Sequence, residues 1–141
     1  MKRAEGRPIH IVAFDIPVPV NYGGAIDIYY KLRSLSELGT RIHLHCFQYG
    51  REKAPELEEY CEQVSYYPRI RWPWLHFSRR PFIISSRKSL SLLGDLLADD
   101  DPILFEGLHT TRWLDHPALA GRHRIVRTHN IEHQYYKGLA R

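Results

Sequence analysis

The sequence predicts an α/β protein, a Rossmann-like three-layer sandwich with a mainly parallel sheet. Two observations carry this prediction. Short apolar segments of strand length alternate along the chain with segments whose apolar residues recur every three or four positions. The connections between them are short, which favours a parallel sheet with helices on both faces. At 141 residues the chain is long enough for one such domain and too short for two.

The first unit of this pattern runs to residue 47. Residues 8–14 are nearly continuously apolar, which predicts a parallel strand buried on both faces. After a long loop, residues 15–24, apolar side chains recur with the spacing of a helix; they are Ala25, Ile28, Tyr29, Leu32 and Leu35. Gly39 is expected to end this helix. Residues 41–47 then alternate as a second strand; one face carries Ile42, Leu44 and Cys46, and the other His43 and His45.

The alternation continues to the end of the chain. A short acidic helix is expected at 55–61, with Pro55 at its start, followed by a brief strand at 64–67. A leucine stripe predicts the next helix; its members are Leu90, Leu92, Leu93, Leu96 and Leu97. Strands are expected at 102–106 and 124–129, with a short helix or turn at 111–119 between them. A last helix is expected to begin near Ile131.

Composition narrows the class of protein. Hydrophobic residues make up 43% of the chain and no tract is of low complexity, which excludes a disordered or fibrous protein. The net charge of +4 allows an anionic ligand and does not point to nucleic acid. Cys46 and Cys61 fit no metal-binding spacing, and Cys46 is expected to be a buried thiol. The polar, basic start and the short apolar run after it predict a cytoplasmic protein.

Three polar segments are expected at the carboxyl ends of the strands, where ligands bind in such sheets. They are residues 15–24, 106–111 and 128–133, all rich in glycine, histidine, asparagine or carboxylate. The turns at the opposite edge of the sheet look ordinary by comparison. This convergence places the candidate site at the carboxyl edge.

Gly23 and Gly24 directly precede a predicted helix, so their N–H groups and the helix dipole are suited to a phosphate. The pair forms neither a dinucleotide-binding fingerprint nor a Walker motif. A tight turn that uses positive φ is the alternative.

Histidines provide the candidate reactive groups. His109 lies three residues after Glu106, and His129 follows a predicted strand. Each could act in catalysis or simply form structural hydrogen bonds. His129 and His133 would share one face of a helix, as metal ligands do, although no H-E-x-x-H motif is present.

Arginines are interleaved with aromatic side chains and a histidine between Arg69 and Phe82. This segment suits a peripheral membrane contact, since aromatic and cationic side chains favour the headgroup region. It could also stack on nucleic acid bases, a role that the low net charge disfavours, or pack against the sheet or a partner domain.

The opening strand with its Gly-Gly loop, residues 103–109 (ILFEGLH) and residues 125–133 (IVRTHNIEH) resemble the N-terminal half of glycosyltransferase family 4 enzymes. These enzymes have the GT-B fold, in which two Rossmann-like domains face each other across a cleft. The resemblance covers residues 8–141, and its most specific part is the THNIEH stretch.

The resemblance implies a role for each matching residue. Gly23 and Gly24 would approach the diphosphate of the sugar donor, and His109 and His129 would be catalytic. Gly24→Val is therefore expected to weaken the use of the donor while the fold stays intact. Substrate-binding residues would be Asn21, Tyr22, Glu106 and Asn130.

The same resemblance makes residues 1–141 a single acceptor-binding domain, with the donor-binding C-terminal domain absent and the reading frame expected to continue. The enzyme would transfer a hexose such as mannose or glucose from a UDP- or GDP-sugar to a saccharide or lipid-linked acceptor. It would retain the anomeric configuration, need no metal cofactor, and work in the cytoplasm or at the inner face of the membrane.

Two alternatives stay open from the residues alone. One is a metal-dependent hydrolase that uses Glu106, His109, His129 and His133. The other is a non-catalytic module that binds a partner through the segment 69–82.

Overall fold

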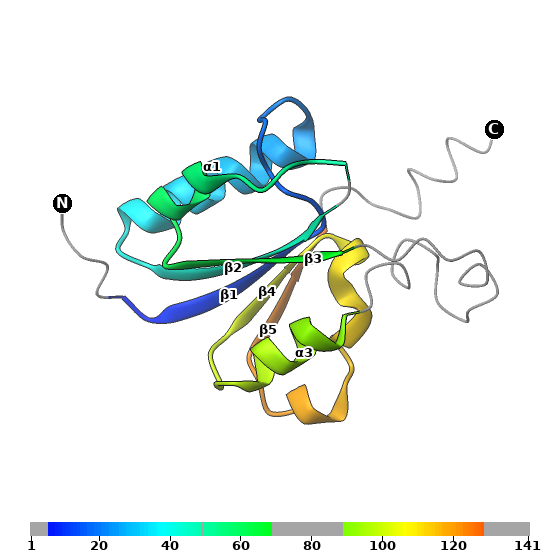
Figure 1. The fold of residues 1–141 in the computed structure, drawn as a ribbon. Helices are drawn as coiled ribbons and strands as arrows, with labels where there is room; N and C mark the ends of the chain where they lie inside the picture. Colours follow the sequence, from blue (N-terminus) through cyan, green and yellow to red (C-terminus); the bar gives the residue numbers. More distant parts are fainter. Residues whose placement is uncertain (1–5, 49, 69–88, 129–141) are drawn as a thin grey trace.

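In a computed structural model, which describes residues 6–48, 50–68 and 89–128, the chain forms a parallel sheet covered by helices (Figure 1). The strands are β1 (Pro8–Ala13), β2 (Arg41–Gln48), β3 (Gln63–Pro68), β4 (Ile103–Glu106) and β5 (Arg124–Arg127). Their order is β3-β2-β1-β4-β5, and every neighbouring pair is parallel. The chain therefore starts in the middle of the sheet and builds outward on both sides, as in a Rossmann-like fold. The predicted fold class is confirmed.

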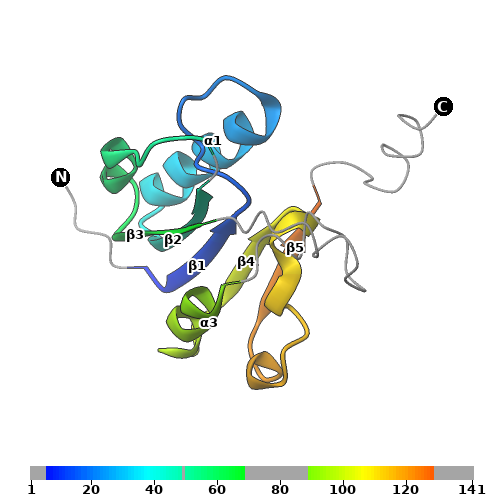
Figure 2. The ribbon, with the colours of Figure 1, turned by 45° about the vertical axis from the view of Figure 1, so that its right-hand side comes forward.

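Helices lie on both faces of this sheet, which makes three layers. Helix α1 (Gly23–Glu37) covers one face together with the 3-10 helix η1 (Pro55–Glu59). Helix α3 (Leu90–Leu97) and the 3-10 helices η3 (Leu108–Trp113) and η4 (Pro117–Leu119) lie on the opposite face. Figure 2 shows the same separation after a rotation of the molecule.

Alternation along the strands divides the core into two clusters. Ile11 and Ala13 of β1 pack with Leu32 of α1, whereas Val12 packs with Leu92 and Leu96 of α3. The predicted faces of β2 are confirmed, because Ile42, Leu44 and Cys46 all join the α1 cluster. Cys46 is fully buried, as expected.

The end of α1 also follows the prediction. Gly39 has φ +85°, a conformation that glycine adopts without the steric cost of a side chain. Its N–H donates to the carbonyl of Ser36 at 3.0 Å. The glycine therefore ends the helix and turns the chain into β2.

Some elements are shorter than expected. The predicted helix at 55–61 is a 3-10 helix that ends at Glu59, and the strand expected at 124–129 ends at Arg127. β1 ends at Ala13 and does not include Phe14, whose ring lies against Gly24 at the start of α1. The helix expected from Ile131 lies outside the described residues. No helix in the described ranges combines the length and apolar character that a membrane span requires.

Candidate functional site at the carboxyl edge

Arg51 organises the loop between β1 and α1. From the segment after β2, its guanidinium donates to the carbonyl oxygens of Ile16 at 3.0 Å and Pro19 at 2.7 Å. It also donates to Oδ1 of Asn21 at 2.5 Å. The side chain of Arg51 is only 14% exposed, although its partner Asn21 lies at the surface. Asn21, a predicted substrate-binding residue, thus lies at this edge with its oxygen engaged by Arg51.

Tyr22 completes this arrangement. The guanidinium of Arg51 lies 4.8 Å from the centre of the Tyr22 ring, within the range of a cation–π contact. The hydroxyl of Tyr22 donates to Oδ2 of Asp15 at 3.4 Å, and the same oxygen lies 3.7 Å from Nε of Arg51. Two predicted substrate-binding residues, Asn21 and Tyr22, are therefore positioned by one arginine.

A pocket of about 490 Å³ opens beside this loop. Its walls contain cationic side chains, carboxylates and one amide. These polar residues are Asn21, Arg51, Glu52, Lys53 and Glu56. Mixed donors and acceptors of this kind suit a polyhydroxyl ligand better than a purely anionic one. Val18 and Pro19 supply the apolar part of the wall.

Gly23 and Gly24 form the first turn of α1, with Tyr22 as the capping residue. The side chain of Tyr22 makes no capping hydrogen bond, and the first turn contains no acidic residue. The alternative of a positive-φ turn is wrong, since neither glycine has a positive φ. The first N–H groups of α1 therefore point out of the helix toward the loop, at the positive end of its dipole.

The two glycines differ in their surroundings. A Cβ atom on Gly23 would meet no atom within 4 Å, whereas one on Gly24 would lie 2.5 Å from Cζ of Phe14. A side chain at Gly24 would therefore have to displace the Phe14 ring. The backbone that is open to a ligand is that of Gly23.

Glu106, the last residue of β4, is fully buried on the α1 face, where Nζ of Lys31 donates to its carboxylate. Lys31 also pairs with Asp27 at 3.4 Å, and Arg127 of β5 pairs with the other oxygen of Asp27 at 2.9 Å. Two cations and two carboxylates thus balance at this edge. A ligand that binds Glu106 would have to share it with Lys31.

The structure does not describe all the predicted site residues. The backbone of His109 lies in η3, but its side chain is outside the described part of the chain. The same holds for the whole of His129, Asn130 and His133, and for the segment 69–82. Among the residues that the structure brings together, sequence reasoning missed Arg51, Lys31 and Arg127. Each is an ordinary basic residue with no local pattern around it.

Comparisons with known proteins give a distant relative. The chain is 29% identical over 137 residues to a Klebsiella pneumoniae protein described as an uncharacterized 44.6 kDa protein in the cps region. The match covers 93% of the chain and 35% of that relative, so the chain spans about a third of its length. The chain matches no family model and no solved structure.

Proposed function

We propose that this chain is the acceptor-side, N-terminal half of a glycosyltransferase of capsule or related polysaccharide biosynthesis. The Rossmann-like sheet is consistent with one half of a GT-B enzyme. The cps region named for the Klebsiella relative supports polysaccharide biosynthesis as the setting. Because that relative is about three times as long, it has room for a second, donor-binding domain.

The observation that carries the proposal is the amino end of α1. Its first turn has no side-chain cap and no acidic residue, and Gly23 is exposed. In transfer from a nucleotide-sugar, a diphosphate leaves with growing negative charge. Helix N–H groups and nearby basic side chains stabilise such charge without a metal. In this proposal α1 and Arg51 supply part of that field, and a UDP- or GDP-sugar is the donor.

The acceptor belongs in the pocket beside Arg51. Its mixture of carboxylate, amide and cationic groups can hydrogen-bond the hydroxyls of a saccharide. Glu106 and Asn130 extend this surface toward β4 and β5 in our proposal, and His109 and His129 orient the reacting sugar. A lipid-linked acceptor would bring the segment 69–82 to the inner face of the membrane.

The hydrolase alternative is less well supported. Glu106 would have to bind a metal while Lys31 donates to its carboxylate from the same side. A fixed ammonium at that position repels a divalent cation and competes for the oxygen.

The proposal is tested in the protein expressed from its complete reading frame. Transfer from UDP- and GDP-hexoses to oligosaccharide acceptors is followed by mass spectrometry. Two variants at Gly23, where a Cβ would meet no atom within 4 Å, differ in the charge they introduce. They are Gly23→Asp and Gly23→Ala. An acidic side chain in the first turn favours the helix but repels a diphosphate, so Gly23→Asp should lower kcat/KM for the donor at least tenfold. Gly23→Ala should stay near wild type.

Two outcomes would contradict different parts of the proposal. If no nucleotide-sugar is hydrolysed or transferred, the enzyme class is wrong. If transfer occurs and Gly23→Asp matches Gly23→Ala, the class stands and the role of α1 is wrong.

A further inference from the structure

Three histidines form a row on the α3 face of the sheet, away from the carboxyl edge. His10 lies on β1, and His43 and His45 lie on β2. The centre of the His45 ring is 5.0 Å from that of His10 and 3.9 Å from that of His43. His10 and His45 are buried, with 2% and 0% exposure. The proposed transferase makes no use of them.

These histidines belong to a hydrogen-bonded chain that crosses the core. Nε2 of His10 lies 2.8 Å and 3.0 Å from the two carboxylate oxygens of Asp99. Nδ1 of His10 lies 2.8 Å from Nε2 of His45, whose Nδ1 lies 2.7 Å from the hydroxyl of Tyr67. That hydroxyl donates to Oδ2 of Asp95 at 2.5 Å. One end of the chain, Asp99, is 38% exposed.

The direction of this chain follows from its far end. Tyr67 donates to Asp95, so its phenol oxygen accepts from Nδ1 of His45. Nε2 of His45 then accepts from Nδ1 of His10, and Nε2 of His10 faces the carboxylate of Asp99.

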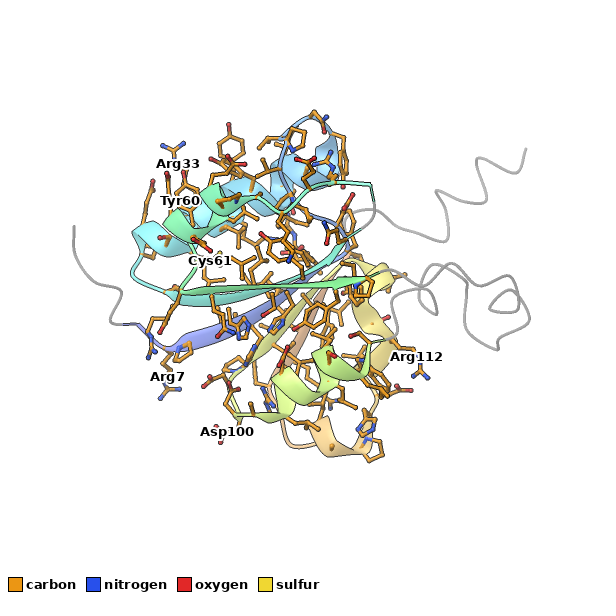
Figure 3. All side chains as sticks on the ribbon, in the orientation of Figure 1. Arg7, Arg33, Tyr60, Cys61, Asp100 and Arg112 are labelled. Atoms are coloured by element: carbon orange, nitrogen blue, oxygen red, sulfur yellow. The ribbon has the colours of Figure 1, made fainter. Side chains whose placement is uncertain are left out.

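A pocket of about 160 Å³ leads to this position from the amino edge of the sheet. Its lining includes His10, His43, Asp99 and Asp101. One ligand atom from each of His10, Asp99 and Asp101 lies within 4.8 Å of the others. Asp99 and Asp101 lie in the loop between α3 and β4. Figure 3 shows Asp100 of this loop, together with Arg7, at the end of the molecule where β1 begins, and Arg112 at the opposite end.

We propose that His10, Asp99 and Asp101 bind a divalent transition-metal ion such as Zn²⁺ or Mn²⁺. Metal–ligand bonds of about 2.1 Å separate the donor atoms by about 3.0 Å in octahedral geometry and by about 3.4 Å in the tetrahedral geometry of Zn²⁺. Nε2 of His10 and the oxygens of Asp99 lie 2.8 Å and 3.0 Å apart, which is closer to the octahedral spacing. An imidazole ligand favours such ions over Mg²⁺ and Ca²⁺. Water from the pocket completes the coordination.

The contact of His10 with His45 fits this assignment. The N–H of His10 at Nδ1 is held by His45, and such an outer hydrogen bond orients a metal-binding imidazole. Arg122 lies 3.3 Å from Oδ1 of Asp99, so the ion would bind through Oδ2 and would have to overcome the repulsion of this guanidinium. Arg122 also donates to the carbonyls of Leu96, Asp99 and Asp101, so the loop is already fixed in place.

Two further groups near the pocket do not oppose a cation. Arg41 is paired with Glu62 through two contacts of 2.7 Å and 2.9 Å, so its charge is balanced. His43 contacts Ser65 at 3.0 Å through Nε2. The three histidines also bring ligand atoms within 4.8 Å of one another, but both nitrogens of His45 are already engaged, by His10 and by Tyr67.

An ion at this position would link the loop between α3 and β4 to β1. It would therefore stabilise the domain, since an ion that binds the folded state raises the free energy of unfolding. This role is independent of the proposed transferase activity.

The test uses the chelator-treated protein and titration calorimetry with Zn²⁺ and Mn²⁺, followed by thermal unfolding with and without the ion. We expect one ion per chain and a higher unfolding temperature, with no competition from millimolar Mg²⁺. Asp101→Asn should weaken binding at least tenfold. Asp100→Asn is the matched control, because it removes the same charge from the same loop outside the ligand set, and it should change affinity less than twofold.

His10→Gln should abolish binding, with circular dichroism to show that the fold persists. The proposal is overturned if Asp101→Asn binds as tightly as wild type. It is also overturned if Asp100→Asn loses as much affinity as Asp101→Asn, since the acidic loop would then attract cations only through its charge.

Discussion

Arg51, on the segment after β2, donates a 2.5 Å hydrogen bond to the side-chain oxygen of Asn21, on the loop before α1. The same guanidinium holds the carbonyls of Ile16 and Pro19. One side chain therefore sets the shape of the loop that leads to the open end of α1. This relationship makes Arg51 the first residue to test.

Arg51→Lys should lower the free energy of unfolding by about 1–3 kcal/mol, because lysine cannot reproduce several hydrogen bonds of a planar guanidinium. Hydrogen exchange should rise in residues 16–22. Arg33→Lys is the control, because Arg33 pairs with Glu37 at the surface, with side chains 52% and 68% exposed. It should change stability by less than about 0.5 kcal/mol. Equal effects of the two variants in denaturant titrations would mean that Arg51 does not hold the loop.

Gly24→Ala should destabilise the domain by about 1–2 kcal/mol, because the new Cβ would lie 2.5 Å from Cζ of Phe14. Phe14→Leu in the same chain should recover part of this loss. Gly23→Ala, with nothing within 4 Å of its Cβ, should be neutral or slightly stabilising. Thermal unfolding measures all three. An unchanged melting temperature for Gly24→Ala would contradict the packing.

The expectation that Gly24→Val probes the phosphate site while the fold stays intact stays a prediction, and it requires the Phe14 ring to move. A Cβ at this position would lie 2.5 Å from Cζ of Phe14. Gly23 is the position at which the backbone can be tested without damage to the core.

Lys31→Met should cost about 3–5 kcal/mol, because it removes the ammonium that pairs with the buried carboxylate of Glu106. The double variant Lys31→Met with Glu106→Leu should recover most of this loss, since two apolar side chains of similar size can replace a buried ion pair. Urea titrations of the single and double variants give the coupling energy. If the two substitutions have simply additive costs, the pair is not coupled.

Stability should fall in alkali. Burial raises the pKa of Cys61 to about 12 from its usual 9.0, and burial likewise raises the pKa of Cys46. The thiols lose protons above pH 9 in the unfolded chain but not in the folded one. Their stabilising contribution is thus complete below pH 9 and is lost as pH rises toward the folded pKa. Each thiol should cost about 1.4 kcal/mol per pH unit above 9.

Cys61→Ala is the control for this effect. Figure 3 shows Cys61 between η1 and the sheet. The alanine variant removes the thiol there and adds no charged group. Its free energy of unfolding should fall less steeply between pH 9 and pH 10 than that of the wild type. Parallel curves would show that Cys61 does not titrate on unfolding.

Much of the fold was predictable because strands and helices leave local traces. The apolar run at 8–14 predicted the buried strand β1, which ends at Ala13. Gly39 predicted the end of α1, where the chain adopts a positive φ that favours glycine. The alternation of β2 also assigned His43 and His45 to one shared face of the sheet. The carboxyl-edge loops followed from the direction of parallel strands, which gathers their residues at one edge whatever contacts they make there.

The amino acid order by itself determined the class of fold, the two faces of β2 and the edge at which the glycine loop lies. Only the tertiary structure decided which charges meet. Lys31 and Glu106 are separated by 75 residues, and His10 and Asp99 by 89. Burial patterns repeat within a few residues, so they can be read locally. Ion pairs and hydrogen-bonded chains depend instead on how distant segments fold together in space, and no short motif encodes that.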